Sequence, residues 1–234
     1  MTSGPAGQLV GDRELLFFYY PRACSLAVHI ALEEAGLTYH RRLVDLKSMQ
    51  NRSADYLALN PKGAVPALAI GPEVLTETHA ILTFIGDLRP ELSLLPPTGD
   101  FRRYRAHEWM NFLSSSVHTS IRSIFRSSAY AGSDPCANEE VNRQGVRNLA
   151  KATTVVEEQL QGHAWALGDG FSVVDAYLFI MYLWTTDERI ASVPDRPNWD
   201  RVAANVWQRP AVRRVVEVER RDRNYPVPAH WGFA

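Results

Sequence analysis

The sequence predicts a small α/β layer over its first third, followed by a region made only of helices. Up to Leu88 the apolar residues follow the order strand, helix, strand, hairpin and helix, which is typical of a small α/β layer. From Phe101 onward no segment has a convincing strand pattern, and apolar residues recur at helical spacing. We therefore expect one α/β domain and one all-α domain in the same chain.

The segment that joins the two regions is rich in helix-breaking residues. These residues are Pro90, Pro96, Pro97 and Gly99, and we interpret their segment as the interdomain linker. The expected domains are residues 14–92 and residues 99–234. Residues 1–13 form a polar N-terminal extension that contains Gly and Pro.

The first expected elements are a buried strand and a helix. The run from Leu15 to Tyr20 is aromatic and aliphatic and ends at Pro21, as a short buried strand would. Apolar residues then recur at helical spacing from Leu26 until Gly36, a residue type that commonly ends helices. Residues 37–46 alternate weakly and are expected to form the second strand.

A hairpin and a second helix complete the α/β layer. Val65-Pro66 opens the next strand, where Pro is tolerated because its first residue need not donate to the ladder. Gly71-Pro72-Glu73 is a turn sequence, and Val74-Leu75 begins the return strand. Thr76-Glu77-Thr78 then supplies a cap for an amphipathic helix that runs to Leu88.

The first helix of the second region has an apolar stripe. The stripe consists of Trp109, Phe112, Leu113 and Val117. Asn111 and His118 are seven residues apart, close to two helical turns, so we expect them to share a face offset from that stripe.

Further helices follow in the second region. Ser172 to Asp175 matches a capping box, which makes the Asp175 carboxylate structural rather than catalytic. It starts a helix over residues 176–184 that is apolar nearly all round and is expected to form the core of this domain. The other expected helices are residues 141–161, 199–209 and 210–219.

Composition excludes several classes of function. Lys plus Arg number 25 against 26 for Asp plus Glu, so there is no basic excess for nucleic acid or an anionic membrane. No apolar run approaches the roughly 20 residues that span a bilayer. The start of the chain has no apolar signal-peptide core. Cys24 and Cys136 lie far apart without metal-like spacing, so we expect free thiols and a cytoplasmic protein.

Cys24 is the first residue that could carry chemistry. It lies at or just before a helix N-terminus, where unpaired N–H groups and the helix dipole stabilise a thiolate. The alternative is a buried, inert cysteine.

Two further features lie nearby in the sequence. If the Val65-Pro66 bond is cis, it turns the backbone of Val65 outward as an edge that a peptide can pair with. Glu77-Thr78 at a helix start offers N–H donors and a hydroxyl to a carboxylate, and an acid to an ammonium group. A simple helix cap is the alternative for this last feature.

Together these segments resemble the glutathione transferase family, and specifically its bacterial beta class. The matching strings are Phe18 to Leu26 with His29 to Leu32, Asn60 to Leu68, Val74 to Glu77, Glu108 to Phe112, and Asp169 to Leu178. They keep the order and spacing of that family from about Leu15 to about Val216. The resemblance implies a thioredoxin-like N-terminal domain and an all-helical C-terminal domain.

The resemblance also implies roles for individual residues. The bond before Pro66 would be cis, and Val65, next to Ala64, would pair with the cysteinyl part of glutathione. Glu77 and Thr78 would take the γ-glutamyl group. The further candidate site residues that the resemblance implies are Cys24, Met49, Asn111 and His118, and Tyr19 and Ser25 join them because they lie near Cys24 in the sequence. Among these, Cys24 would lie beside the glutathione sulfur, with Ser25 as the second candidate, whereas Tyr19 is expected to point into the sheet.

This chain departs from the family pattern at several positions. Arg22 stands where a Gly is usual, and Met49 where a Lys often contacts the glycyl carboxylate, although Lys47 lies two residues away. The usual His-Lys pair is His118-Thr119, and Ser116 replaces a Glu. These changes imply weaker glutathione binding or a changed pose.

Three functions are consistent with the sequence. The first is conjugation of the glutathione thiolate to a small hydrophobic electrophile, with detoxification as the role. The second uses Cys24 for glutathione-dependent thiol–disulfide exchange, peroxide reduction or dehalogenation. The third is a binding module of this fold without catalysis.

The expected partners are glutathione, a hydrophobic electrophile and a second copy of the chain. A homodimer follows from the resemblance, and symmetric dimers are the commonest oligomers. Glutathione would be a co-substrate, and we expect no other cofactor, no metal, no nucleic acid and no membrane.

Overall fold

The computed structural model describes residues 14–168, 170–190 and 193–225. The expected N-terminal extension over residues 1–13 therefore lies outside the described residues. Internal contacts divide the described chain into two compact units. The first comprises residues 14–104 and 207–225, and the second comprises residues 105–206.

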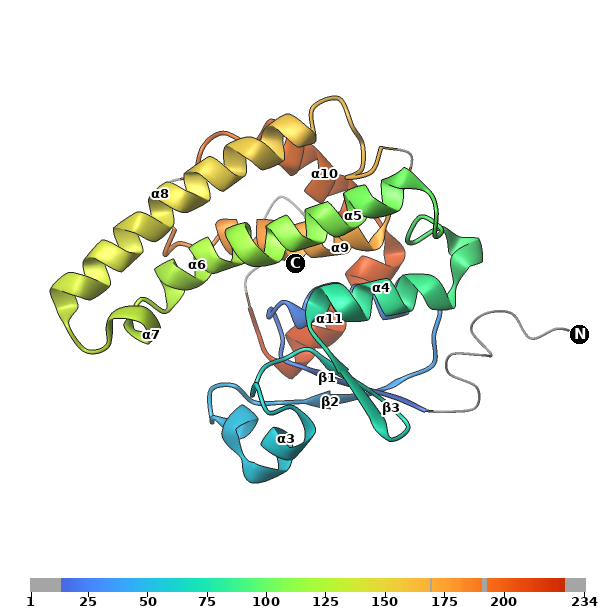
Figure 1. The fold of residues 1–234 in the computed structure, drawn as a ribbon, viewed down its shortest axis with the longest axis horizontal. Helices are drawn as coiled ribbons and strands as arrows, with labels where there is room; N and C mark the ends of the chain where they lie inside the picture. The colour runs from blue at the N-terminus through green and yellow to red at the C-terminus, as the bar shows by residue number, and fades with distance from the viewer. Residues whose placement is uncertain (1–13, 169, 191–192, 226–234) are drawn as a thin grey trace, which may run out of the picture. The chain divides into compact units, whose positions relative to one another are not determined.

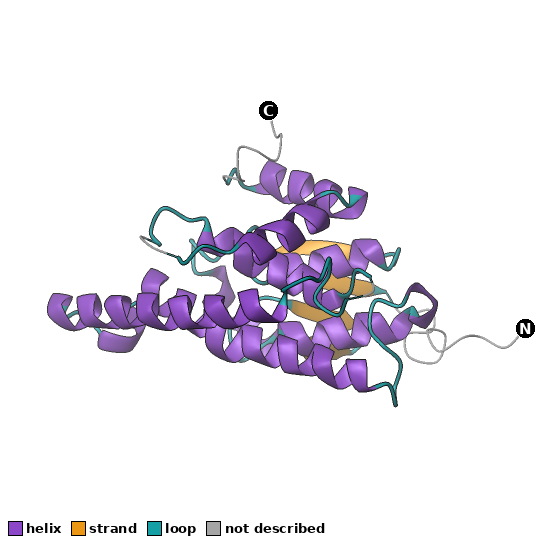
Figure 2. Cartoon of the chain, turned by 90° about the horizontal axis from the view of Figure 1, so that it is seen from above, coloured by secondary structure: helices purple, strands orange, loops and turns teal. Residues whose placement is uncertain are grey.

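The first unit contains a mixed four-stranded sheet. Its strands are β1 (Leu15–Tyr19), β2 (His40–Leu43), β3 (Ala67–Ile70) and β4 (Glu73–Thr76), in the order β2-β1-β3-β4. β1 pairs in parallel with β2 and antiparallel with β3, which pairs antiparallel with β4. In Figure 2 the strands lie together in one layer. The predicted hairpin is confirmed, whereas β2 is shorter than the predicted 37–46.

Helices pack on this sheet. They are α2 (Ser25–Glu34), α3 (Ala54–Leu59), α4 (Thr78–Leu88) and α11 (Pro210–Asp222), with short 3-10 turns η1 (Gln50–Arg52) and η2 (Pro90–Leu92). Residues 25–32 of α2 are all buried, because α2 contacts both α4 and α11. The predicted strand and helix around Pro21 are therefore confirmed, and their order matches a thioredoxin-like layer.

α11 belongs to the first unit although it comes last in the chain. Arg209, at its N-cap, donates two hydrogen bonds to the carboxylate of Glu34 in α2, at 2.6 and 2.7 Å. The paired, planar geometry makes this a strong form of ion pair. The compact units thus differ from the sequence segments 14–92 and 99–234, whose boundary remains a prediction.

The second unit is helical throughout its described residues, as predicted. Its helices are α5 (Phe101–Phe112), which begins within the first unit, then η3 (Leu113–Val117), α6 (His118–Phe125), α7 (Ser128–Ala131), α8 (Pro135–Gln159), α9 (Val173–Thr185) and α10 (Pro197–Trp207). Every residue of α9 is buried, and the Ser172–Asp175 capping box is present. Both predictions for α9 are confirmed.

A wide turn interrupts the long helix that begins at Phe101. In η3 the N–H of His118 donates to the C=O of Leu113, five residues earlier, which makes this segment a π-turn. Figure 1 shows α5 and α6 as one continuous ribbon that runs alongside α8. The prediction that Asn111 and His118 share a face assumed a regular helix, and that assumption is wrong.

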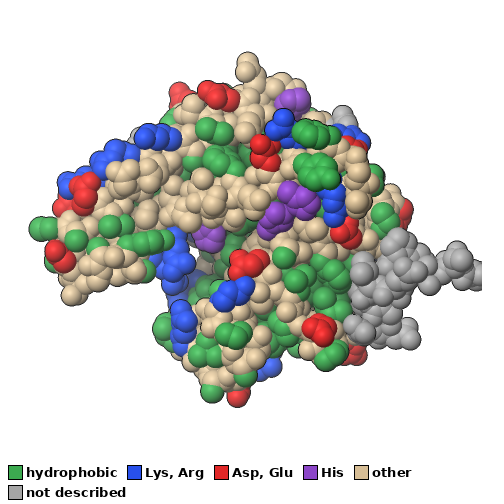
Figure 3. All heavy atoms as spheres, viewed as in Figure 1, with side chains coloured by type: hydrophobic (Ala, Val, Ile, Leu, Met, Phe, Trp, Pro, Cys, Tyr) green, Lys and Arg blue, Asp and Glu red, His purple; other side chains and the backbone are tan. Residues whose placement is uncertain are grey.

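α8 packs closely on α6 and exposes a charged outer face. Gly145 of α8 lies against α6, where a Cβ atom would come within 2.9 Å of the Ile124 side chain. On the outer face Glu140 binds both Arg143 and Arg147, at 2.7 and 2.9 Å. Basic and acidic side chains lie next to one another along α8 in Figure 3. This alternation fits the nearly neutral composition.

None of the helices in the described residues is both long and apolar enough to cross a bilayer.

Candidate active site

The loop between β1 and α2 presents Cys24 at the start of α2. Cys24 is the N-cap residue of that helix, as the sequence predicts. The Ser25 hydroxyl donates to the C=O of Tyr20 at 3.0 Å and accepts from its N–H at 3.2 Å. Ser25 is fully buried, so its hydroxyl closes the loop and does not support the prediction that it can replace Cys24 at the glutathione sulfur.

The Cys24 thiol is held in its protonated form. Burial raises its pKa, and the hydrogen bond from the Thr78 side chain offsets this only in part. The thiol donates to the C=O of Val65 at 3.3 Å. The expectation that the helix N-terminus would give a thiolate is wrong, because desolvation outweighs the N–H groups and the helix dipole.

The Val65-Pro66 peptide bond is cis, as the resemblance implies. The loop that leads to it is fixed by hydrogen bonds to the C=O of Ala64, from the Tyr56 hydroxyl and the Asn60 amide, both at 2.7 Å. Within the described residues the N–H of Val65 has no hydrogen-bond partner. An unpaired donor therefore lies beside the Cys24 thiol at the entry to β3.

Glu77 and Thr78 lie at the N-terminus of α4. Thr78 is buried and Glu77 exposed, and Glu77 takes a left-handed φ of 75°. Lys62 approaches from the preceding loop, and its Nζ lies 2.5 Å from the Glu77 carboxylate. A carboxylate and the N–H groups of a helix start therefore adjoin the Cys24 loop, as the sequence predicts. Sequence reasoning assigned no role to Lys62, because nothing local indicates where a lysine side chain in a loop will end.

The side chain of Tyr19 has partners elsewhere in the first unit. Its hydroxyl donates to Asp222 at 2.6 Å and accepts from Arg41 at 2.7 Å, and its ring stacks with Phe17 and tilts against His29. Burial together with the Asp222 contact raises the pKa of Tyr19 well above its ordinary value. The structure therefore does not support Tyr19 as a glutathione ligand, and it places this side chain against α2 and α11.

At two of the departures from the family pattern the backbone is left-handed. Arg22 and Met49 both adopt a φ of 61°, the left-handed region that favours Gly. The N–H of Arg22 donates to Glu219 at 3.1 Å. Met49 is 59% exposed and offers an apolar side chain where a cation was expected, so nothing here supports it as a ligand for a carboxylate.

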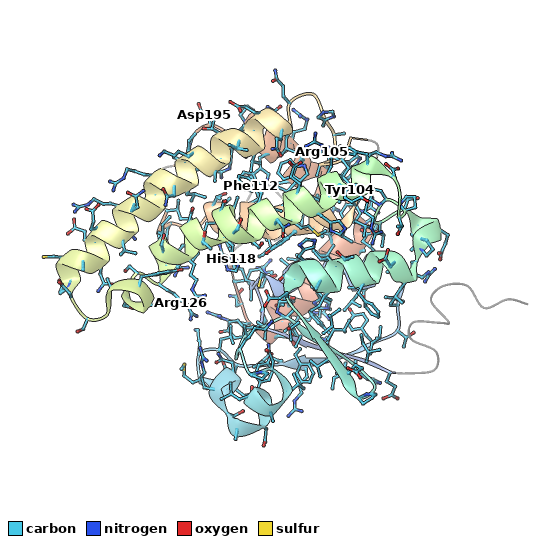
Figure 4. The ribbon with its side chains drawn as sticks, viewed as in Figure 1. Tyr104, Arg105, Phe112, His118, Arg126 and Asp195 are labelled. Carbon is cyan, nitrogen blue, oxygen red and sulfur yellow. The ribbon has the colours of Figure 1, made fainter. Side chains whose placement is uncertain are left out.

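Asn111 and His118 belong to the second unit. The His118 ring lies 4.9 Å from that of Trp184. Figure 4 labels His118 on the continuous α5–α6 ribbon, C-terminal to Phe112. Their roles at the glutathione site remain predictions.

Both halves of the chain match models of one protein family. The glutathione S-transferase N-terminal domain model matches residues 22–88, and the C-terminal domain model matches residues 116–210.

The chain belongs to the glutathione S-transferase family.

Among curated relatives of this glutathione S-transferase, GstA of Escherichia coli O157:H7 is 37% identical over 169 residues, 71% of this chain and 80% of the relative. GST-4.5 of Xanthomonas campestris is 38% identical over 70% of this chain and 79% of the relative. The predicted family and enzyme class are confirmed.

Solved structures agree with this assignment. A glutathione transferase homologue from Sulfitobacter with bound glutathione superposes with a TM-score of 0.80 at 30% identity, over 88% of this chain and 98% of that chain. A beta-class enzyme from Sphingomonas chungbukensis gives a TM-score of 0.76 at 32% identity, over 87% and 98%. The predicted fold, a thioredoxin-like domain followed by a helical domain, is confirmed.

Proposed function

We propose that this glutathione S-transferase conjugates the thiolate of glutathione to small hydrophobic electrophiles, with Cys24 beside the reacting sulfur. The observation that carries the proposal is the unpaired N–H of Val65 next to the Cys24 thiol. An extended peptide can pair its own backbone with such an edge. Its central cysteinyl residue would then lie within reach of Cys24.

The protonated state of Cys24 determines its part in the reaction. A thiol can donate a hydrogen bond to a neighbouring thiolate, whereas two thiolates would repel each other. The sulfur of bound glutathione would take the place of the Val65 C=O as the acceptor of the hydrogen bond from the Cys24 S–H. That hydrogen bond stabilises the glutathione thiolate, which is the attacking nucleophile. Thr78 and the N–H groups at the start of α4 would hold the γ-glutamyl carboxylate, and Glu77 its ammonium group.

Conjugation to 1-chloro-2,4-dinitrobenzene tests this function. We expect the wild-type protein to conjugate it and the Cys24→Ala variant to lose about tenfold in kcat/KM, the effect of one hydrogen bond. Cys24→Ser keeps a donor and should retain most of the activity. An absence of conjugation together with an absence of binding heat at millimolar glutathione contradicts the proposal.

Thiol–disulfide exchange is the second candidate, because Cys24 is a partly exposed free cysteine at a helix start. In that reaction the Cys24 thiolate attacks a glutathione mixed disulfide, forms a disulfide with glutathione and releases the other thiol. A second glutathione thiolate then attacks this disulfide, which restores Cys24 and releases oxidised glutathione. The raised pKa of Cys24 makes this slow at neutral pH. Reduction of a mixed disulfide that exceeds conjugation in rate, and that Cys24→Ser abolishes, favours this candidate.

A homodimer, a cytoplasmic location, and roles of Asn111 and His118 beside the bound glutathione are further parts of the proposal. Light scattering after size-exclusion chromatography tests the dimer. A mass of about 26 kDa, that of one chain, at micromolar concentration would contradict it.

A further inference from the structure

Lys62 joins the two segments that flank the expected γ-glutamyl position. Its Nζ lies 2.5 Å from Oε1 of Glu77 and 2.6 Å from the hydroxyl of Thr76, at the end of β4. The contact thus links the loop before the cis peptide bond to the start of α4. The ammonium group of Lys62 therefore lies directly against the Glu77 carboxylate, which in the proposed function binds the ammonium group of glutathione.

The backbone of Lys62 is fixed by a buried side chain. Asn60 is almost fully buried. Its Oδ1 accepts from the N–H of Lys62 at 3.2 Å, and its Nδ2 donates to the C=O of Ala64 at 2.7 Å. The same residue therefore sets the position of Lys62 and the path of the chain into Val65. This local structure places the backbone of Lys62 relative to the unpaired edge, and the contacts with Thr76 and Glu77 place its Nζ.

Stability does not explain the ion pair. The side chains of Lys62 and Glu77 are 49% and 68% exposed, and exposed pairs of this kind contribute little to folding. Both charges remain accessible to a ligand. An amino-acid head group carries an ammonium and a carboxylate on one carbon atom, so a neighbouring Lys and Glu present the complementary pair of charges.

We propose that Lys62 joins Thr78 and the N–H groups of α4 in binding the α-carboxylate of the γ-glutamyl end of glutathione, while Glu77 binds the ammonium group of the same end. This inference rests on the proposed function. Glutathione binding replaces the Lys62–Glu77 contact by two contacts with the ligand, so neither charge is left without a partner. Lys62 is a positioning and specificity residue: it selects ligands with a free α-amino-acid head group, and it touches no reacting atom.

The position of Met49 agrees with this assignment. Glutathione carries two carboxylates and one ammonium, and the family lysine that often takes the glycyl carboxylate is absent here. The chain contains three lysines, Lys47, Lys62 and Lys151. A cation at the γ-glutamyl end therefore contributes a larger share of the charge complementarity in this protein.

Calorimetry with the unreactive analogue S-methylglutathione tests the proposal. Lys62→Met should weaken binding about tenfold, and Lys62→Arg should restore part of the loss. The second ligand is 4-aminobutyryl-(S-methyl)cysteinyl-glycine, which lacks only the α-carboxylate. Lys62→Met should change its affinity less than about twofold, because the partner of Lys62 is missing. Lys151→Met, an exposed lysine of α8 in the other unit, is the matched control and should bind both ligands as the wild type does.

Amine labelling gives a readout independent of affinity. With three lysines in the chain, acetylation of each can be followed by mass spectrometry, and S-methylglutathione should protect Lys62 but not Lys151. If Lys62→Met binds S-methylglutathione as the wild type does, or weakens both ligands equally, this inference is overturned and the proposed function stands. If the wild type binds neither ligand, both this inference and the proposed function are contradicted.

Discussion

The Nδ1 atom of His29 lies 2.8 Å from Oε1 of Glu219, and both side chains are buried. The pair links α2 to α11, two helices separated in sequence by most of the chain. The second oxygen of Glu219 accepts from the N–H of Arg22 at 3.1 Å. Glu219 thus holds both the middle of α2 and the loop that leads to Cys24.

Removal of this carboxylate should destabilise the first unit strongly. Glu219→Ala removes the acceptor of the Arg22 N–H and the partner of the buried His29 ring, which costs about 3–5 kcal/mol of unfolding free energy. Glu219→Gln keeps an acceptor oxygen and should cost clearly less. Urea unfolding measures both. A loss below about 1 kcal/mol for Glu219→Ala would show that the pair does not stabilise this packing.

Cys24 should react slowly with thiol reagents at neutral pH. Burial raises the pKa of its thiol above the ordinary value of 9.0, so the thiolate fraction and the alkylation rate should grow about tenfold per pH unit from pH 7 to 9. The measurement uses iodoacetamide on the Cys136→Ser variant, because Cys136 is exposed. Thr78→Val removes a hydrogen bond that lowers this pKa and should slow the reaction further. A rate that levels off below pH 8 is incompatible with this prediction.

Asp175 should make the free energy of unfolding decrease as the pH rises. Burial raises its pKa from 3.8 to about 6, although Ala166 and Ser172 donate hydrogen bonds to it. Between these values the folded protein holds more protons than the unfolded chain. The contribution of Asp175 is therefore full below pH 4 and decreases as the pH rises through 6, by at most about 3 kcal/mol.

Asp175→Asn cannot lose this proton and serves as the reference. Urea titrations at pH 4.5 to 7.5 give the unfolding free energies of the wild type and of Asp175→Asn. As the pH rises, the wild type should lose stability relative to Asp175→Asn. A constant difference would mean that the hydrogen bonds fully compensate burial.

Met49→Gly should stabilise the protein. Met49 is exposed and has a left-handed φ of 61°, which costs a residue with a Cβ atom about 1 kcal/mol. Met49→Ala retains that strain and is the control. We expect a higher urea midpoint for the Gly variant and an unchanged one for the Ala variant. Equal midpoints for the two variants would refute the strain argument.

Gly145→Ala should destabilise the contact between α6 and α8. The added methyl group would lie within 2.9 Å of Cγ1 of Ile124 and 3.1 Å from the C=O of Ser120, and overpacking of this kind costs about 1–3 kcal/mol. Gly170 has no neighbour within 4 Å of the corresponding position, so Gly170→Ala should have little effect. The prediction fails if thermal unfolding does not separate the two variants.

The elements that sequence predicts well are those with local signals. Pro21 and Gly36 bound the first strand and helix, and the capping box at Ser172 starts α9, a helix that is buried on all sides. The segments around the cis peptide bond and the start of α4 were also identified correctly. Each depends on residues close together in the chain.

The missed features depend on distant residues or on the backbone. The partner of Tyr19 is Asp222, 203 residues later, so nearness to Cys24 in the sequence made Tyr19 a candidate without any sign of its competing partner. The pKa of Cys24 depends on the residues that bury it, which come from several elements. Ser25 carries a hydroxyl suited to catalysis, and only the loop geometry reveals that this hydroxyl is hydrogen-bonded to the backbone of Tyr20.

The π-turn from Leu113 to Val117 holds one residue more than a regular helical turn. Buried residues lie on both sides of it, Ala106 and Met110 before it and Ile121 and Ile124 after it. Deletion of one serine from Ser114 to Ser116 could restore a regular helix, and it would then rotate the whole of α6, His118 included, relative to α5. The loss of one codon in this stretch would thus misplace several side chains at once, including those that α6 packs against α8.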